Sequence, residues 1–220
     1  MIKIKLNEAR RDEAINEAIA VLLRGGIIAY PTETFYGLGV KYDMPESLKR
    51  LYELKKRPGE KAMPVIISHR GLLSEIVQKE WLAHLPNAAQ SLMDRFWPGP
   101  LTLLFPAKEG LSEFLTAGTG MIAVRVPGES FALQLSKKAG FPFTATSANL
   151  SGMPPAVNAE EVMQYFGERL DLLIDSGQAR GGRPSTIVDV SGAGIKIVRE
   201  GMISPAEIED HLGHLEQGSA

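Results

Sequence analysis

The segment at residues 25–39, GGIIAYPTETFYGLG, constrains the fold more than any other part of this sequence. Its apolar run Ile27–Ala29 lies between glycines and a proline, which predicts a short strand buried on both faces. Pro31 has no N–H group to donate, so the strand ends there, and the polar segment Thr32–Thr34 follows at once. The next two glycines favour a sharp turn or a close approach to a ligand. The segment is therefore either a strand with a glycine-rich turn or a ligand-binding loop at the carboxyl end of a strand.

Apolar runs and helix-forming segments alternate in the first half of the chain, and pairs of strands with short turns occur in the second half. This order predicts an α/β protein with a twisted mixed β-sheet and helices packed on it. Strands are expected at residues 2–6, 27–29, 65–67, 101–105, 122–126, 142–145, 172–174, 186–190 and 195–199. No repeat or long linker divides the chain. We therefore predict a single domain over residues 1–212 and a disordered tail at residues 213–220.

Composition excludes several classes of protein. The 220 residues include no cysteine, which rules out disulfides, thiolate zinc sites and cysteine nucleophiles and fits a cytoplasmic protein. The formal net charge of -2 gives no overall basic field, so any contact with nucleic acid needs a local patch. No apolar run has the length needed to span a membrane, and no membrane partner is expected.

Familiar catalytic motifs are missing from the sequence. It contains no phosphate-binding P-loop, no dinucleotide-binding glycine fingerprint, no HExxH zinc helix and no GxSxG nucleophile elbow. His211 and His214 are three residues apart on the expected last helix, and we interpret them as solvated side chains rather than as metal ligands. What remains is a set of loops rich in Lys, Arg, Ser, Thr and Asn. Such loops suit an anionic ligand that brings its own metal ion, as in phosphoryl and nucleotidyl transfer.

Three of these segments have two interpretations each. The basic segment Lys55–Arg57, with Lys61 after a Pro-Gly turn, is either a helix end that complements the helix dipole or a phosphate-binding cluster. Arg125 interrupts an apolar strand, so it lies on a solvated face or holds a carboxylate or phosphate in a fork. The hydroxyl and amide side chains of Thr146–Ser151 make local turns or bind a ligand.

Taken together and in order, these segments resemble the YrdC family. The resemblance covers residues 25–201 and is specific because several separate motifs match at once. The matching segments are PTET with YGLG at 31–39, KKR at 55–57, FWPGPLT at 96–102, TSANLSG at 146–152, PSTIVD at 184–189 and VREG at 198–201. This chain resembles the short form of the family, without the second C-terminal domain that some relatives carry.

The resemblance implies a fold, an activity and partners. The family fold is a twisted α/β sheet with a central positively charged cavity. The family activity is threonylcarbamoyl-AMP synthase: L-threonine, bicarbonate or carbon dioxide, and ATP give threonylcarbamoyl-AMP and pyrophosphate. The resemblance further implies Mg²⁺ bound through the ATP phosphates and a downstream transferase that modifies tRNA, and it leaves open a weak contact with tRNA itself.

The resemblance also implies roles for individual residues. Lys55 and Arg57 are expected to be catalytic. ATP is expected to bind Arg57, Lys61, Ser147, Asn149 and Arg199, and L-threonine to bind Thr34, Arg125 and Ser185. No metal ligand is expected from the protein. Many relatives have histidine where this chain has Ile66, which puts one contact with the amino acid in doubt.

Two other functions fit the same family fold. A module that binds double-stranded RNA or tRNA would use the same basic cavity, but the slightly acidic net charge and the lack of a basic–aromatic run argue against it. A carbamoyl-transfer domain of hydrogenase maturation shares the fold, but its full-length form has cysteine-rich zinc modules. Pyrophosphate release that depends on threonine distinguishes the synthase from the RNA-binding module.

Overall fold

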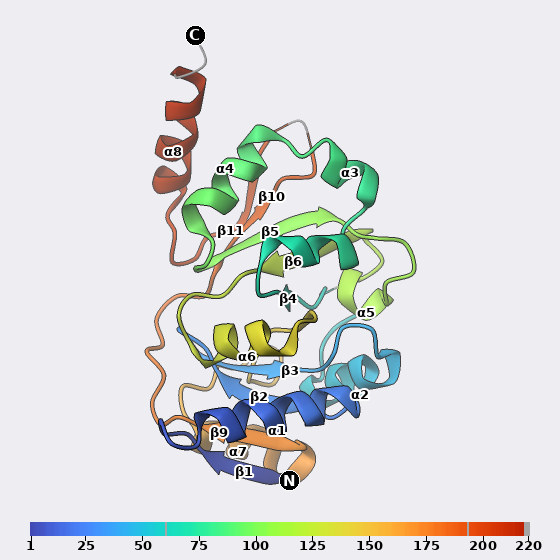
Figure 1. Ribbon diagram of the computed structural model, residues 1–220, viewed down its shortest axis with the longest axis vertical. Coiled ribbons are helices and arrows are strands. Elements are labelled where there is room, and N and C mark those ends of the chain that lie inside the picture. Colours follow the sequence, from blue (N-terminus) through green and yellow to red (C-terminus); the bar gives the residue numbers. More distant parts are fainter. Residues whose placement is uncertain (60, 193, 218–220) are drawn as a thin grey trace.

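A computed structural model describes residues 1–59, 61–192 and 194–217 of the chain. Its strands form two mixed sheets with helices packed on them (Figure 1). The α/β class with mixed strand directions is therefore confirmed. The expectation of a single sheet is wrong, because the strands divide into one group of five and one group of six.

The five-stranded sheet contains the strands of the segment at residues 25–39. Its strands, in spatial order, are β1 (Ile2–Lys5), β9 (Leu172–Asp175), β2 (Ile28–Pro31), β3 (Tyr36–Gly39) and β8 (Thr146–Ser147). Strand β9 runs parallel to β1 and β2, whereas β2–β3 and β3–β8 are antiparallel pairs. Every residue of β2 is buried, as its apolar sequence predicts. The polar segment that follows it is thus the loop of the β2–β3 hairpin.

The six-stranded sheet contains most of the remaining strands. In spatial order they are β11 (Lys196–Arg199), β10 (Thr186–Asp189), β5 (Leu101–Pro106), β6 (Met121–Arg125), β4 (Val65–Ile66) and β7 (Phe143–Thr144). The pairs β10–β5 and β4–β6 are parallel and the other pairs are antiparallel. Ile66 lies beside Arg125 in the β4–β6 ladder.

One short segment explains why there are two sheets. The expected single strand near residues 142–145 is in fact two strands, because β7 pairs with β4 in one sheet and β8 pairs with β3 in the other. Only Ala145 separates them, and its N–H donates to the carbonyl of Pro64 at 2.8 Å. Thr144 joins the sheets a second time, since its Oγ1 accepts from the N–H of Val40 at 3.0 Å. The chain therefore passes from one sheet to the other beside the Ser147–Asn149 motif.

Helices cover both sheets and enclose two apolar cores. The smaller core lies where α1 (Arg11–Leu23) and α6 (Phe131–Ala139) pack against β2 and β9. The larger core takes residues from both sheets and from α2 (Pro45–Lys55), α4 (Asn87–Phe96) and α7 (Ala159–Phe166). The shorter helices are α3 (Lys79–Ala83), α5 (Glu113–Thr116) and the 3₁₀ helices η1 (Arg70–Glu75) and η2 (Gly167–Arg169).

The glycines of β3 serve a close contact rather than a turn. Both lie in the strand, where a Cβ atom on Gly37 would be 3.2 Å from the ring of Tyr30, and one on Gly39 would be 2.9 Å from it. Tyr30 is fully buried, and its hydroxyl donates to the carbonyl of Thr144 at 3.0 Å. Glycine is needed at both positions because the Tyr30 ring lies flat against the β3 backbone.

The C-terminal helix extends further than the sequence pattern predicted. Helix α8 spans Pro205–Gln217, so residues 213–217 are helical and not a disordered tail; residues 218–220 lie outside the described part of the chain. Pro205 begins the helix and Ile208 is buried, as expected, and helical hydrogen bonding continues past the last apolar position. No helix of the described residues is long and apolar enough to cross a membrane.

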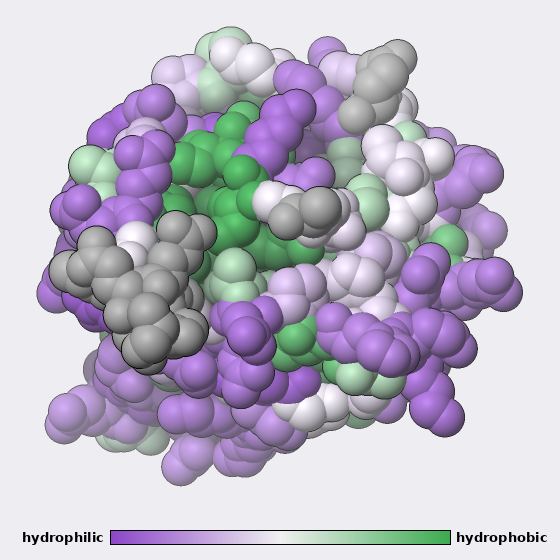
Figure 2. All heavy atoms as spheres, turned by 90° about the horizontal axis from the view of Figure 1, so that it is seen from above, coloured by the Kyte–Doolittle hydropathy of each residue, from purple (hydrophilic) through white to green (hydrophobic). Residues whose placement is uncertain are grey.

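The surface at the end that carries α8 has a hydrophobic patch surrounded by hydrophilic residues (Figure 2). Few large apolar side chains are exposed in the described chain. Among them, Val198 on β11 and Met202 just after it are about half exposed. Gly201 lies between these two residues in the sequence, and its backbone lies close to the backbone of residues 184–186.

We predict that Gly201→Ala destabilises the protein by about 1–3 kcal/mol. A Cβ atom there would lie 2.3 Å from the carbonyl oxygen of Pro184 and 2.4 Å from backbone atoms of the next two residues, so the backbone would have to move. Urea unfolding measures the change as a lower midpoint with an unchanged slope. Gly192→Ala in the same hairpin region is the control, because its nearest neighbour would be 3.9 Å away. Equal midpoints for the two variants would contradict the prediction.

Candidate functional site

Lys55 lies at the end of α2 and is buried, with 1% of its surface exposed. Its Nζ atom donates to the carbonyl of Ser147, to the carbonyl of Asn149 at 2.7 Å and to Oδ1 of Asn149 at 3.2 Å. Burial, and to a smaller extent the positive charge of Arg57, lowers the pKa of Lys55 to about 7. The lysine of the basic segment is therefore bound to the Ser147–Asn149 loop and does not extend into solvent.

The Ser147–Asn149 loop is fixed by its own side chains as well. Ser147 donates its hydroxyl to Oδ1 of Asn149 at 2.7 Å, and Nδ2 of Asn149 donates to the carbonyl of Met153. Ser151 also links the loop to the end of α2, because its N–H donates to the carbonyl of Lys55 at 2.9 Å. Its hydroxyl is buried and has no hydrogen-bond partner among the described residues. The local turn predicted for this segment forms, and it places the motif against the end of α2.

Arg57 holds the loop that follows α2. Its Nε donates to the carbonyl of Lys61 at 2.9 Å, its Nη2 to the carbonyl of Ala62 at 2.6 Å, and its Nη1 lies 3.4 Å from the hydroxyl of Thr146. Burial is the main reason why the pKa of Arg57 is lowered. The Lys61 side chain is exposed, and it is the backbone of Lys61 that contacts Arg57.

Arg199 and Ser185 form a second polar group at the other sheet. Arg199 lies at the end of β11 and donates through Nη2 to the carbonyl of Ser185 at 2.7 Å and to its hydroxyl at 3.2 Å. The same hydroxyl lies 2.9 Å from Oγ1 of Thr102 on β5. The close approach of Gly201 to residues 184–186 brings these groups together.

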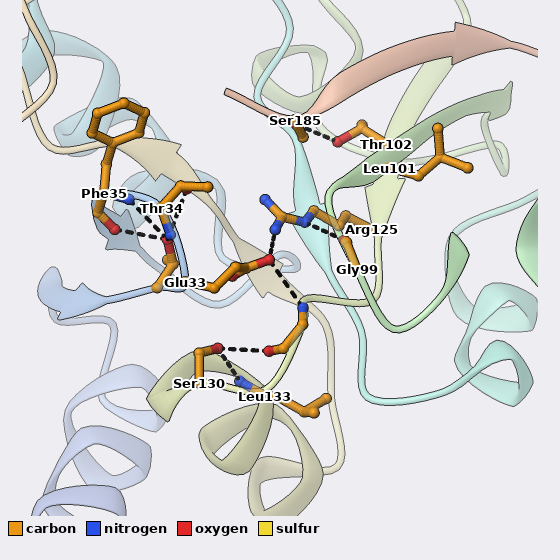
Figure 3. A network of polar contacts seen from close by, with 12 residues as sticks. Glu33, Thr34, Phe35, Gly99, Leu101, Thr102, Arg125, Ser130, Leu133 and Ser185 are labelled. Carbon is orange, nitrogen blue, oxygen red and sulfur yellow. Dashed lines mark hydrogen bonds and ion pairs between the residues drawn. The ribbon is translucent and has the colours of Figure 1, made fainter. Parts of the chain in front are cut away.

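Arg125 lies between this group and the β2–β3 loop (Figure 3). It extends from the end of β6, donates through Nε to the carbonyl of Gly99 at 2.9 Å and forms an ion pair with Glu33. The Glu33 carboxylate also accepts from the N–H of Gly128 at 3.0 Å. The ion pair therefore links the β2–β3 loop of one sheet to the end of β6 in the other.

The β2–β3 loop is a turn built around one hydroxyl. Oγ1 of Thr32 accepts from the N–H groups of Thr34 and Phe35 at 3.1 and 3.2 Å and donates to the carbonyl of Phe35 at 2.7 Å. The carbonyl of Thr34 accepts from the N–H of Gly181 at 2.7 Å. This hydrogen bond attaches the β2–β3 loop to the segment that precedes Ser185 in the sequence. Thr34 itself is buried and faces the region of Arg125 in Figure 3.

The cations of the site are close enough to repel one another. The charge of Arg57 contributes to a lowered pKa at Lys55 and at Arg199, and the charge of Arg199 contributes to the lowered pKa of Arg125, about 10; burial is the larger cause in all three. Arg125 and Arg199 of the six-stranded sheet and Arg57 of the loop after α2 thus form a connected positive region. An anionic ligand would be favoured there.

The structure brings most of the expected site residues together in this region. Lys61 is an exception, because its side chain is exposed on the loop. The positively charged central cavity implied by the resemblance stays a prediction: a hollow of about 560 Å³ that the structure contains lies elsewhere, beside Val77, Gln78 and Lys108. Among the described residues, no group of three or more His, Asp or Glu side chains could hold a metal ion; the His214 side chain lies outside them.

Sequence reasoning missed Glu33 as a site residue, although it quoted the motif that contains it. The available signal was a carboxylate placed directly after a buried strand, in a chain where a strand arginine also needed a partner. Thr102 and Thr146 were missed too, and they contact Ser185 and Arg57 respectively. Neither hydroxyl is distinguishable in sequence from one that makes a local turn.

Comparison with known proteins decides the family. The family model Sua5_yciO_yrdC, described as telomere recombination, matches residues 20–201. The chain belongs to the Sua5/YciO/YrdC family. The resemblance drawn from the sequence motifs is confirmed, and all the site residues named above lie within the matched region.

Curated relatives in this family are named threonylcarbamoyl-AMP synthase. The protein from Pyrococcus abyssi is 35% identical over 214 residues, which are 97% of this chain and 62% of that protein. The protein from Bacillus subtilis is 36% identical over 94% of this chain and 59% of its own length. The protein from Idiomarina loihiensis is 36% identical over 79% of this chain and 91% of its own length. The chain thus spans about three-fifths of the length of the first two relatives.

Solved structures of family members have the same fold. The crystal structure of P. abyssi Sua5 complexed with L-threonine superposes with a TM-score of 0.86 at 32% identity, over 96% of this chain and 60% of that one. The crystal structure of E. coli YciO superposes with a TM-score of 0.80 at 25% identity, over 94% of this chain and 98% of that one. The arrangement of two mixed sheets is therefore shared within the Sua5/YciO/YrdC family.

We predict a pH-dependent contribution of Lys55 to stability. Its pKa is about 7 in the folded protein, so between pH 7 and 9 the unfolded chain, with an ordinary lysine pKa of about 10.4, binds more protons and stability rises with pH. Conversely, this contribution is lost as the pH falls toward 7. The free energy of unfolding of the wild type minus that of Lys55→Met should therefore rise by at most about 1.4 kcal/mol per pH unit in this window.

Urea unfolding at several pH values measures this difference. Lys49→Met, at an exposed position on the same helix, is the control and should give a difference that does not change with pH. A flat difference for Lys55→Met as well would mean that the three oxygen atoms around Nζ hold the ammonium form without a shift in pKa.

Proposed function

We propose that this protein is a threonylcarbamoyl-AMP synthase. It joins L-threonine, carbon dioxide or bicarbonate, and ATP into threonylcarbamoyl-AMP and releases pyrophosphate. The observation that carries the proposal is the connected positive region in which the charge of Arg57 acts on Arg199 and the charge of Arg199 acts on Arg125. It would place cations for phosphates beside a guanidinium for the carboxylate of an amino acid. Membership of the Sua5/YciO/YrdC family supports the same activity.

The residues would divide into two groups. Arg57, Arg199 and the Ser147–Asn149 loop would bind the nucleotide, and Lys61 on its exposed loop would reach the phosphates. Thr34, Arg125 and Ser185 would bind L-threonine. Mg²⁺ would enter on the ATP phosphates, since the side chains of the described residues provide no cluster of metal ligands, and it would neutralise part of the phosphate charge.

The chemistry needs positioning and charge more than a strong base. The neutral amine nitrogen of threonine forms a bond to carbon dioxide and releases a proton to water, which gives a carbamate. A carbamate oxygen then bonds to the α-phosphorus while the bond to the bridging oxygen breaks and pyrophosphate leaves. Arg57 and Arg199 would stabilise the negative charge that develops on the phosphates. A downstream enzyme would transfer the threonylcarbamoyl group to tRNA.

We predict that purified protein with ATP, Mg²⁺ and bicarbonate releases pyrophosphate only when L-threonine is added. Arg57→Ala should lower this rate by about 100-fold or more, because it removes a partly buried cation next to the expected phosphates. Arg24→Ala, at an exposed position after α1, is the control and should keep the wild-type rate. Threonine-independent release, or an unchanged rate in a folded Arg57→Ala variant, would contradict the assignment.

We predict that the protein prefers L-threonine to serine, and serine to valine. Serine lacks one methyl group of threonine, so it should react more slowly by about 10- to 200-fold. Valine lacks the hydroxyl and could not form the hydrogen bond expected with Thr34 or Ser185, so it should be slower still. The same pyrophosphate assay with each amino acid gives the order. Valine activity equal to or above that of serine would show that neither hydroxyl recognises the substrate.

A further inference from the structure

The ion pair of Glu33 and Arg125 leaves one carboxylate oxygen without a partner. The side chains of Glu33 and Arg125 are 16% and 12% exposed. Oε1 of Glu33 is used twice, by Arg125 and by the N–H of Gly128. Oε2 is buried and accepts no hydrogen bond from any residue that the structure describes. A buried carboxylate oxygen without a donor is unfavourable, so this atom points to a donor that the described residues do not supply.

Arg125 has one guanidinium nitrogen, Nη1, that could donate to a ligand. Its Nε is bound to the carbonyl of Gly99 and its Nη2 forms the ion pair with Glu33. Its Nη1 makes no hydrogen bond to the described part of the chain. The pair therefore presents a positive edge and a negative oxygen side by side, next to Thr34 and below Ser185 in Figure 3. An α-amino acid carries the matching charges, with its carboxylate and its ammonium group separated by one carbon atom.

We propose that Glu33 is a specificity-determining residue that accepts the α-ammonium group of the amino acid whose carboxylate binds Arg125. The inference rests on the proposed function, since it takes Arg125, Thr34 and Ser185 as the amino-acid site. It adds the group that distinguishes an amino acid from a hydroxy acid or an ordinary carboxylate. Oε2 is the accepting atom, and Oε1 stays on Gly128 and Arg125.

The competing explanation is that Glu33 is a structural link. Through Gly128 it holds the segment before α6, where the carbonyl of Gly128 also accepts from the hydroxyl of Ser130 at 2.9 Å. A link of this kind would act on every ligand of the site equally, because it would position Arg125 and the loop. An ammonium acceptor would act only on ligands that have an ammonium group. The difference between two ligands, and not the loss of affinity alone, therefore decides between the explanations.

The experiment is calorimetric titration of L-threonine and of (R)-3-hydroxybutanoate, which is threonine without its amino group. The wild type should bind threonine about 10- to 100-fold more tightly than the hydroxy acid. Glu33→Gln keeps the size of the side chain and an oxygen for Gly128. It should lose most of this preference, because threonine binds more weakly and the hydroxy acid binds as well as before or better to the unpaired Arg125. Glu129→Gln, an exposed glutamate beside Gly128, is the matched control and should keep the wild-type preference.

Each outcome bears on a different claim. Equal weakening of both ligands in Glu33→Gln, with the ratio unchanged, would overturn the inference in favour of the structural link. If Glu33→Gln does not fold, the wild type alone still decides, because equal affinity for threonine and the hydroxy acid would show that no group recognises the ammonium. A wild type that binds ATP but neither small ligand would overturn the proposed amino-acid site itself, and with it the role of Glu33.

Discussion

The site depends on one constraint: several cations lie in one region, where Lys55 is buried, Arg57 and Arg125 are partly buried and Arg199 is exposed. Charged groups are costly to remove from water unless oxygen atoms replace the lost hydration. Here Lys55, Arg57 and Arg199 each donate to main-chain carbonyls, and Arg125 donates to one carbonyl and pairs with Glu33. Carbonyls satisfy hydrogen bonds but do not cancel charge. The region is therefore well bonded and remains positive, which is the condition for binding anions with little reorganisation.

The same contacts hold the two sheets together. Glu33 follows β2 in the five-stranded sheet, and Arg125 ends β6 in the six-stranded sheet. Lys55 connects α2 to the loop after β8, just beyond the point where the chain crosses from one sheet to the other. A change in the relative position of the sheets would separate these partners. The geometry of the site and the packing of the two sheets are thus set by one group of interactions.

The sequence predicted the elements well because their signals are local. Apolar runs bounded by Gly and Pro marked β2, β5 and β6, and Pro205 marked the start of α8. The division into two sheets was missed because it depends on which strands pair with β7 and β8, and pairing over long distances leaves no local pattern. The motifs identified the residues of the site, but most of their contacts are with backbone carbonyls. A carbonyl is present at every residue, so no sequence pattern could name Ser147 or Gly99 as the partner of a particular cation.

Lys55 illustrates what this limit means for function. The motif suggests a lysine that contacts phosphate, and the structure gives its ammonium group three oxygen acceptors in the Ser147–Asn149 loop. An ammonium group has three hydrogens to donate, so a direct contact with phosphate would require it to give up one of them. Arg57, by contrast, makes its contacts along the edge of its guanidinium group. Its charge lowers the pKa of both Lys55 and Arg199. The two basic residues of one motif are therefore best understood as performing different tasks, with Lys55 shaping the nucleotide loop and Arg57 supplying the charge.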